Sequence, residues 1–241
     1  ALDVARDICG AQSVHAAGYC LGGTALATAM AWCNRDPEAV PVAHWTLLTT
    51  LTDFSRPGAI EVFLDARSLA YLDRVMARQG FLDGKDMGRT FRMLRSNSLI
   101  WHFAVHRYLY GETPPAFDVL YWNADSTRMP ARTHREFLDQ GLINAFTKPG
   151  AIKVLGTPID MSQVKCDTYV MGGLTDHICP WKNSYAGAKL YGGKVEFVLV
   201  GSGHVQSMVN PPGNPKSAYY VNDELMEAAD GWLKTAKKLQ G

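Results

Sequence analysis

The chain has 241 residues, of which 47% are hydrophobic and 20% are charged. This ordinary globular composition excludes a disordered, collagen-like or disulfide-scaffold protein. The 24 Lys and Arg residues nearly balance the 23 Asp and Glu residues, so the net charge is +1. Without a basic field that could displace counterions from a phosphate backbone, nucleic-acid binding is disfavoured.

Hydrophobic periodicity predicts strands that alternate with helices. In chain order, the expected elements are a helix over 2–8, a strand over 13–17, a helix over 25–32, a strand over 42–50, a strand over 168–171, a helix over 181–190, a strand over 194–200 and a helix over 223–238. The longest uncharged stretch, residues 16–33, is rich in glycine and alanine. We therefore interpret it as strand, turn and buried helix and expect no transmembrane segment.

Residues 57–149 have a different character, because charged, aromatic and leucine residues recur there at helical spacing, most clearly over 99–110. We expect most of the aromatic rings to lie in a core and a few to line the mouth of a site; these residues are Phe63, Tyr71, Phe81, Phe91, Trp101, Phe103, Tyr108 and Tyr110. A helical insertion between strand–helix segments predicts an α/β sheet from residues 1–56 and 150–241, with residues 57–149 as a cap.

The five cysteines and seven histidines show no recurring spacing. No two cysteines form a Cys-x-x-Cys pair, and His102 and His106 lack a third ligand, so we expect neither a disulfide framework nor a metal site. The first residues include Asp3, Arg6 and Asp7 in place of a basic start followed by an apolar run, which disfavours a signal peptide. A reduced, intracellular setting is the better interpretation.

A glycine-rich motif lies between the first predicted strand and the following helix. Residues 18–22, Gly-Tyr-Cys-Leu-Gly, have the form Gly-x-nucleophile-x-Gly, the nucleophile elbow of α/β-hydrolases with cysteine in place of serine. We expect the flanking Gly18 and Gly22 because the strained turn leaves no room for a Cβ atom. Cys20 would stand at a helix N-terminus, which favours a thiolate, and the Leu21 backbone N–H would form half of an oxyanion hole. A buried structural cysteine is the alternative.

Two later segments supply the other residues that such a fold needs. Asp176 follows the strand over 168–171 and His204 follows the strand over 194–200, in the order nucleophile, acid, histidine. Asp176 could instead cap a helix or a turn, and His204 could be a solvated loop residue. Agreement of order, strand context and spacing at three places favours a triad of Cys20, His204 and Asp176.

Other residues compete for two of these roles. Asp53 follows the strand over 42–50 and could supply the acid, or it could be a turn residue. His177 could act as the base, but neighbours in sequence such as Asp176 and His177 seldom point at one another. His15 lies in the first predicted strand, and we expect it to be packed in the core. The histidines without a partner pattern are His44, His102, His106 and His134.

Beyond the elbow, the chain resembles the class I polyhydroxyalkanoate synthases. The matching segments are residues 18–24, 47–54, 94–97 with 99–101, 117–130, 176–181, and 201–204 with 210–212. The run over 121–128, YWNADSTR, is highly specific. The resemblance implies the α/β-hydrolase fold, with Cys20 as nucleophile, Asp176 as acid and His204 as base.

In that family, several strands precede the elbow and a tryptophan-rich stretch closes the chain. This sequence begins one helix before the elbow. We therefore expect it to be a catalytic-domain fragment that lacks the early strands of the sheet and the loop that carries the second oxyanion donor.

The resemblance implies an acyltransferase that polymerises (R)-3-hydroxyacyl-CoA, of the 3-hydroxybutyryl-CoA type, into a polyester with release of CoA. His204 would take the thiol proton of Cys20, and the thiolate would attack the thioester. The 3-hydroxyl of another unit would then attack the acyl-cysteine. Asp176 would either orient His204 or help to deprotonate that hydroxyl.

The same resemblance implies the setting of the reaction. The partners would be the acyl-CoA, the growing polyester chain and a second copy in a homodimer, with coenzyme A as part of the substrate and no further cofactor. The location would be cytoplasmic, at the surface of polyester granules.

Two other functions stay open. A cysteine-dependent hydrolase, such as a thioesterase or a lactone hydrolase, would pass the acyl group to water and yield a free hydroxy acid. A non-catalytic interaction fragment would use its cap helices to bind a partner, and Cys20 would then react like an ordinary exposed thiol.

Overall fold

A computed structural model describes residues 2–36, 40–113, 116, 118, 121–122, 125–211 and 213–240, apart from the side chains of Ile60 and Phe63. Parts of two segments that carry the family resemblance, within 117–130 and at Pro212, lie outside the described residues. The chain divides into two compact units, one formed by Ala1–Gly58 with Gln140–Gly241 and the other by Ala59–Asp139. Residues 140–149 thus belong to the first unit.

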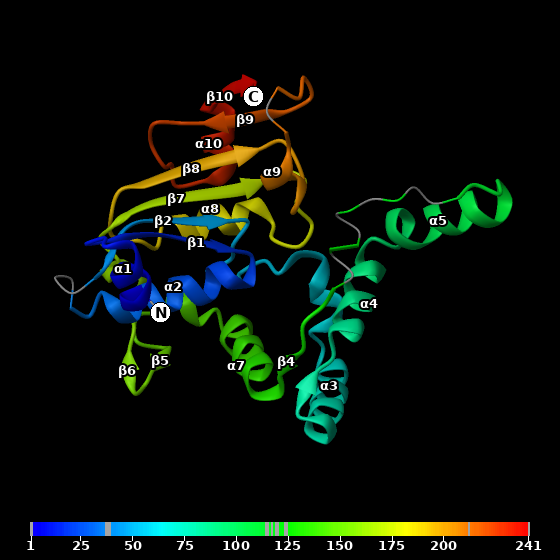
Figure 1. Ribbon diagram of the computed structural model, residues 1–241, viewed down its shortest axis with the longest axis horizontal. Helices are drawn as coiled ribbons and strands as arrows, with labels where there is room; N and C mark the ends of the chain where they lie inside the picture. Colours follow the sequence, from blue (N-terminus) through cyan, green and yellow to red (C-terminus); the bar gives the residue numbers. More distant parts are fainter. Residues whose placement is uncertain are drawn as a thin grey trace. The chain divides into compact units, whose positions relative to one another are not determined.

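The first unit is built on a six-stranded sheet (Figure 1). In spatial order its strands are β1 (Val14–Tyr19), β2 (Val42–Leu48), β7 (Asp167–Gly173), β8 (Val195–Val200), β9 (Ala218–Val221) and β10 (Lys237–Gln240). The first four strands pair in parallel, and β9 and β10 pair antiparallel. The predicted α/β fold with a mostly parallel sheet is confirmed.

The C-terminal segment differs from the single helix predicted over 223–238. It forms a short helix, α10 (Ala229–Thr235), followed by β10, which pairs with β9. The strand β8 is therefore not the last strand of the sheet. A four-residue edge strand that contains two lysines has no alternating pattern, and it forms because the chain returns beside β9.

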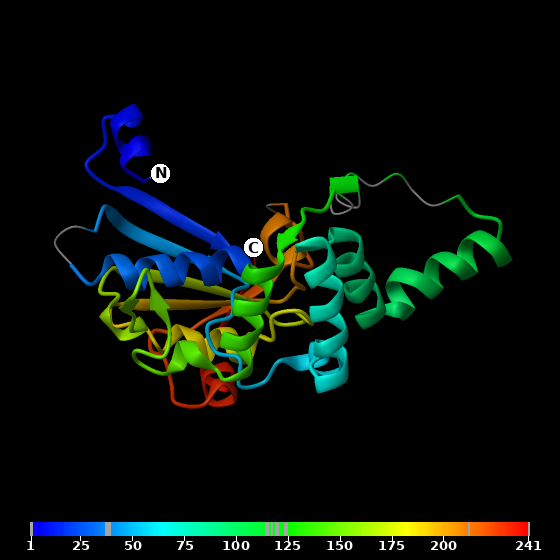
Figure 2. The same cartoon turned by 90° about the horizontal axis from the view of Figure 1, so that it is seen from below.

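One face of the sheet is covered by helices α2 (Leu21–Cys33), α8 (Trp181–Ala188) and α10, which lie on the same side of the strands in Figure 2. Phe197 and Leu199 of β8 are buried against this layer, as the two-residue period of a strand requires. The ring of Trp232 in α10 lies 5.1 Å from that of Phe197 and is fully buried. This core holds the strands whose ends carry the candidate site.

The remaining elements of the first unit are short. They are α1 (Leu2–Cys9), the 3-10 helices η5 (Ala145–Thr147) and η6 (Met161–Gln163), the hairpin of β5 (Lys153–Val154) with β6 (Thr157–Pro158), and α9 (Gln206–Val209). Among the described residues, every helix is too short or too polar to cross a lipid bilayer.

The second unit is mainly helical. Its elements are η2 (Gly58–Phe63), α3 (Ala66–Gln79), β3 (Phe81–Leu82) paired with β4 (Met129–Pro130), α4 (Gly84–Leu94), the π-helices η3 (Asn97–Trp101) and η4 (Val105–Leu109) around α5 (His102–Ala104), and α7 (Ala131–Leu142), whose end enters the first unit. The Asp65 carboxylate accepts the backbone N–H groups of Arg67 and Ser68 and so caps α3. Arg135 of α7 forms an ion pair with Asp73 of α3.

The aromatic rings of this unit are more exposed than predicted. Trp101 is 61% exposed and Tyr108 is 80% exposed, and Tyr71 and Tyr110 are similar. The expectation that most of these rings lie in a core is wrong for the side chains that the structure describes, while Phe63 falls outside them. Helical spacing shows that one face of a helix is apolar, but it does not show that another element covers that face.

Candidate active site

Cys20 lies in a sharp turn between β1 and α2. Its backbone has φ 51° and ψ −125°, a conformation that residues other than glycine seldom adopt. The Cys20 N–H donates to the Leu48 carbonyl oxygen at the end of β2 over 3.0 Å. The sheet therefore holds the strained turn, and the side chain stands beyond the C-terminal ends of the parallel strands.

Two glycines make room for this turn. A Cβ atom on Gly18 would lie 2.5 Å from the Cα of Gly23, and a Cβ atom on Gly23 would overlap the side chain of Thr50. A Cβ atom on Gly22 would meet none of the described atoms within 4 Å. The expectation that Gly22 is needed for close packing is therefore wrong, and Gly23 has that role because α2 begins against the segment after β2.

Asp176 and His204 meet beside Cys20. The Nδ1 atom of His204 and the Oδ2 atom of Asp176 are 2.7 Å apart, and the two side chains are 7% and 0% exposed. The strands β7 and β8 are parallel neighbours, so the loops that follow them emerge at one edge of the sheet. That geometry brings together two residues that are distant in sequence.

The competing residues lie elsewhere or have other partners. Asp176 holds the imidazole of His204 over 2.7 Å. The Asp53 carboxylate accepts the Ser55 backbone N–H over 2.8 Å and the Asn144 side-chain amide over 3.3 Å. Asp53 thus orders its own loop.

His15 is exposed, and its ring stacks on His44 at 5.2 Å between centroids. The expectation that His15 is packed in the core is therefore wrong. The alternation of side chains along β1 places it on the face of the sheet opposite the buried layer.

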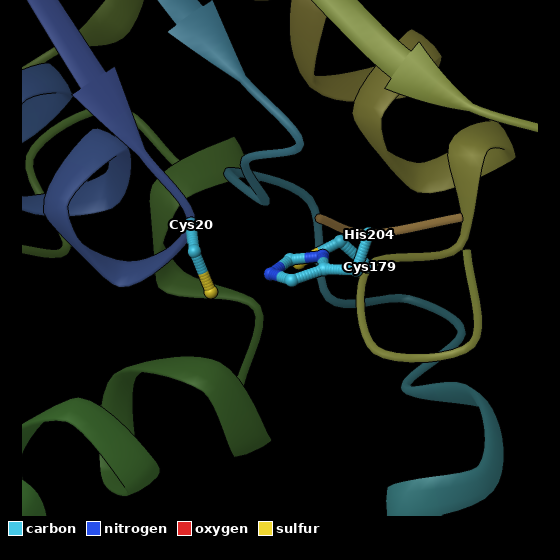
Figure 3. Close-up of side chains that lie close together, drawn as sticks. All are labelled: Cys20, Cys179 and His204. Atoms are coloured by element: carbon cyan, nitrogen blue, oxygen red, sulfur yellow. The ribbon is translucent and has the colours of Figure 1, made fainter. Parts of the chain in front are cut away.

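Two residues beside the triad had no role assigned to them from the sequence. Cys179 is 4% exposed, and its sulfur, the Cys20 sulfur and a ring nitrogen of His204 lie within 4.8 Å of one another. Figure 3 shows the His204 ring extending toward the Cys20 sulfur, with Cys179 behind that ring. The ring of Tyr19 lies 5.0 Å from the His204 ring. The closeness of Cys179 to Asp176 along the chain was the one available signal.

A family model of the alpha/beta hydrolase fold matches residues 1–211. The chain belongs to this family. Poly(3-hydroxyalkanoate) polymerase 2 of Ectopseudomonas oleovorans is 41% identical to it over 241 residues, which are 100% of this chain and 43% of the relative. Poly(3-hydroxyalkanoate) polymerase 1 of the same organism is 39% identical, over 99% of this chain and 42% of the relative.

The poly(3-hydroxyalkanoate) polymerase subunit PhaC of Cupriavidus necator is 37% identical over 247 residues, which cover 100% of this chain and 42% of the relative. This alpha/beta hydrolase chain therefore spans less than half the length of these curated relatives. The similarity to polyhydroxyalkanoate synthases that the motifs indicated is confirmed.

The electrostatics of this alpha/beta hydrolase site favour a charged pair. A hydrogen bond from the Cys179 thiol, assisted by His204 and the Leu21 backbone, lowers the pKa of Cys20 to about 5 in spite of burial. Burial alone would lower the pKa of His204, but its hydrogen bonds to Asp176 and Cys20 raise that pKa to about 9. At neutral pH, Cys20 is therefore a thiolate beside an imidazolium.

Cys179 behaves in the opposite way. The hydrogen bond that it donates to Cys20, together with its burial, raises the pKa of Cys179 well above the ordinary value for a thiol. Cys179 thus stays protonated while its neighbour is ionised, as expected when two thiols share one proton.

Proposed function

We propose that the protein polymerises (R)-3-hydroxyacyl-CoA into a polyester through an acyl-cysteine on Cys20. The observation that carries the proposal is the 2.7 Å hydrogen bond between Asp176 and His204 beside the Cys20 elbow. Its support in sequence is the similarity to poly(3-hydroxyalkanoate) polymerases. The preference for the 3-hydroxybutyryl unit is part of the same proposal.

In the first step, the Cys20 sulfur attacks the carbonyl carbon of the thioester. The lowered pKa of Cys20 means that the thiolate exists before substrate arrives, so His204 need not remove a proton at that moment. The bond to the CoA sulfur breaks, and the His204 imidazolium protonates the leaving thiolate. The Leu21 N–H, which faces the Cys20 sulfur, would stabilise the oxyanion.

In the second step, the now neutral His204 accepts the proton of a 3-hydroxyl group on another unit, and that oxygen attacks the acyl-cysteine. An ester forms and the Cys20 thiolate returns. Exchange of one thioester for another is nearly thermoneutral, so the acyl group stays activated on sulfur, whereas a serine ester would lose this activation. This difference explains why a chain-extending enzyme uses cysteine at the elbow.

The surroundings of Asp176 favour an orienting role over direct deprotonation of the hydroxyl. Its Oδ1 atom accepts the backbone N–H groups of Ile178 and Cys179, and its Oδ2 atom is bonded to His204. Its side chain is 0% exposed. A carboxylate with both oxygens occupied and no exposed surface holds the imidazole in one orientation.

We assign residues 1–56 and 150–241 to the hydrolase core and residues 57–149 to a cap that excludes water from the acyl-enzyme. The interruption of the first unit by Ala59–Asp139 supports an insertion. The chemistry requires no cofactor beyond the coenzyme A of the substrate. A cytoplasmic homodimer at the surface of polyester granules completes the proposal.

Mass spectrometry of the acid-quenched protein after mixing with 3-hydroxybutyryl-CoA tests this function. We expect a hydroxyacyl adduct on the peptide that contains Cys20, release of CoA and an insoluble polyester. Cys20→Ala should lose all three, whereas Cys166→Ala, a matched cysteine outside the site, should keep them. Free hydroxybutyrate as the main product would identify a cysteine hydrolase, and a folded protein with neither adduct nor CoA release would contradict both enzymes.

A further inference from the structure

Cys20, Cys179 and His204 form a cluster of possible metal ligands, and of the three only Cys179 forms no bond with substrate and transfers no proton in the proposed reaction. The three groups come from the segments after β1, β7 and β8, and their ligand atoms lie within 4.8 Å of one another (Figure 3). Two thiols and an imidazole are the donor set that zinc prefers in proteins. Spacing along the sequence does not show this cluster, because positions 20, 179 and 204 are far apart.

We propose that this cluster binds Zn²⁺ and that the bound ion blocks the Cys20 nucleophile. Around a tetrahedral zinc with ordinary Zn–S and Zn–N bonds, the ligand atoms are about 3.5–3.8 Å apart. The ligand atoms lie within 4.8 Å of one another, so each pair must approach by about 1.3 Å at most, which small side-chain rotations supply.

Asp176 already orients two of the three ligands. Its Oδ2 atom bonds to Nδ1 of His204, which leaves Nε2 for a metal, as in carboxylate–histidine–zinc arrangements. Its Oδ1 atom accepts the backbone N–H of Cys179 over 2.9 Å and so holds the loop that carries this ligand. A triad alone would need the first of these contacts and not the second.

Three protein ligands leave a fourth tetrahedral position for water or a thiol, as in Cys₂His zinc sites. Binding would release to solvent the protons that the ligands carry. The ion would occupy both the sulfur that attacks and the nitrogen that transfers protons. Loss of acyl transfer on zinc binding rests on the proposed function, but the binding itself does not.

The test measures metal binding without substrate, in a phosphine reductant that keeps the thiols reduced. Co²⁺ serves as the optical probe, since tetrahedral Co²⁺ bound by thiolates gives intense visible bands and sulfur charge-transfer bands. Zn²⁺ affinity is measured by competition with a chromophoric chelator. We expect one Zn²⁺ per chain and displacement of the Co²⁺ spectrum by Zn²⁺.

Cys179→Val removes one ligand and keeps a similar volume and the backbone N–H that Asp176 accepts. We expect this change to weaken Zn²⁺ binding by about 100-fold, which is the largest effect typical of changes at residues that only orient a metal ligand. The sulfur charge-transfer bands of bound Co²⁺ should become weaker. Cys179→Ser provides a second variant if valine disturbs folding, which circular dichroism would report. Cys166→Ser is the matched thiol control and should bind Zn²⁺ as the parent does.

The exposed His15–His44 pair could bind an adventitious ion, but without sulfur. His44→Gln should therefore leave the thiolate bands unchanged. Equal Zn²⁺ affinity in the parent and both Cys179 variants, or Co²⁺ spectra without thiolate bands, would overturn the proposal. Zinc binding by a protein that forms no acyl adduct would uphold the metal site and refute the synthase, so the two outcomes can be separated.

Discussion

The ring of Tyr19 lies 5.0 Å from the ring of His204, tilted by 41°. Tyr19 is the last residue of β1 and directly precedes Cys20, so the strand that presents Cys20 also packs against His204. Asp176 holds the same imidazole from its Nδ1 atom. His204 is thus restrained by a ring contact from β1 and a hydrogen bond from the loop after β7.

This arrangement predicts a positioning role for Tyr19. Tyr19→Ala should lower the rate of CoA release by about 10-fold, because loss of the ring lets His204 leave its productive orientation. Tyr19→Phe keeps the ring contact and should restore most of the rate. Equal losses in the two variants would assign the effect to the hydroxyl or to folding instead.

The charged pair predicts the pH dependence of Cys20 reactivity. The stabilised thiolate gives Cys20 a pKa of about 5. The rate of alkylation by iodoacetamide should therefore rise with pH, with a midpoint near 5, and be close to its plateau at neutral pH. An ordinary thiol, with a pKa of about 8.5, would be only a few per cent ionised there. A midpoint between pH 8 and 9 would contradict the ion pair.

CoA release should rise with pH as Cys20 ionises and fall at alkaline pH. The fall occurs because the His204 imidazolium, which protonates the leaving group, loses its proton with a pKa of about 9. Stopped-flow measurement of CoA release on the acid and alkaline sides of the optimum would check the pKa values of Cys20 and His204 together.

Asp176 and Asp53 form a matched test of the acid. Asp176→Asn should lower CoA release by about 1,000- to 10,000-fold, since the amide favours the wrong tautomer of His204. Asp53→Asn should keep most activity, because that carboxylate contacts Ser55 and Asn144. Steady-state kinetics of both variants decides the matter, and a comparable loss for Asp53→Asn would reopen the assignment.

Gly23 and Gly22 form a matched test of the elbow. Gly23→Ala should destabilise the protein by about 1–3 kcal/mol, because its Cβ would overlap Thr50 in a packed region. Gly22→Ala introduces a methyl group into open space within α2 and should be neutral or stabilising by up to about 1 kcal/mol. Urea unfolding measures both, and the reverse ranking would contradict the turn geometry.

Prediction worked best where local pattern and chain order carry the information. The elbow, Asp176 and His204 could be identified because each follows a strand with a clear hydrophobic pattern, and parallel strands deliver their C-terminal ends to one edge. Prediction failed for the pairing of β9 with β10, for the exposed aromatic rings and for His15. These features depend on which element covers a given face, and periodicity does not report it.

The amino-acid sequence by itself determined the α/β class and the family, because motif spacing and strand order are properties of the chain. It also indicated the three residues of the candidate triad, whose catalytic roles stay a prediction. Only the tertiary structure decided that Cys179 stands beside Cys20, that Gly23 and not Gly22 is crowded against Thr50, and that Asp53 accepts a hydrogen bond from Asn144. Those facts concern distances between atoms far apart along the chain, which come to exist when the strands pair and the loops close over their ends.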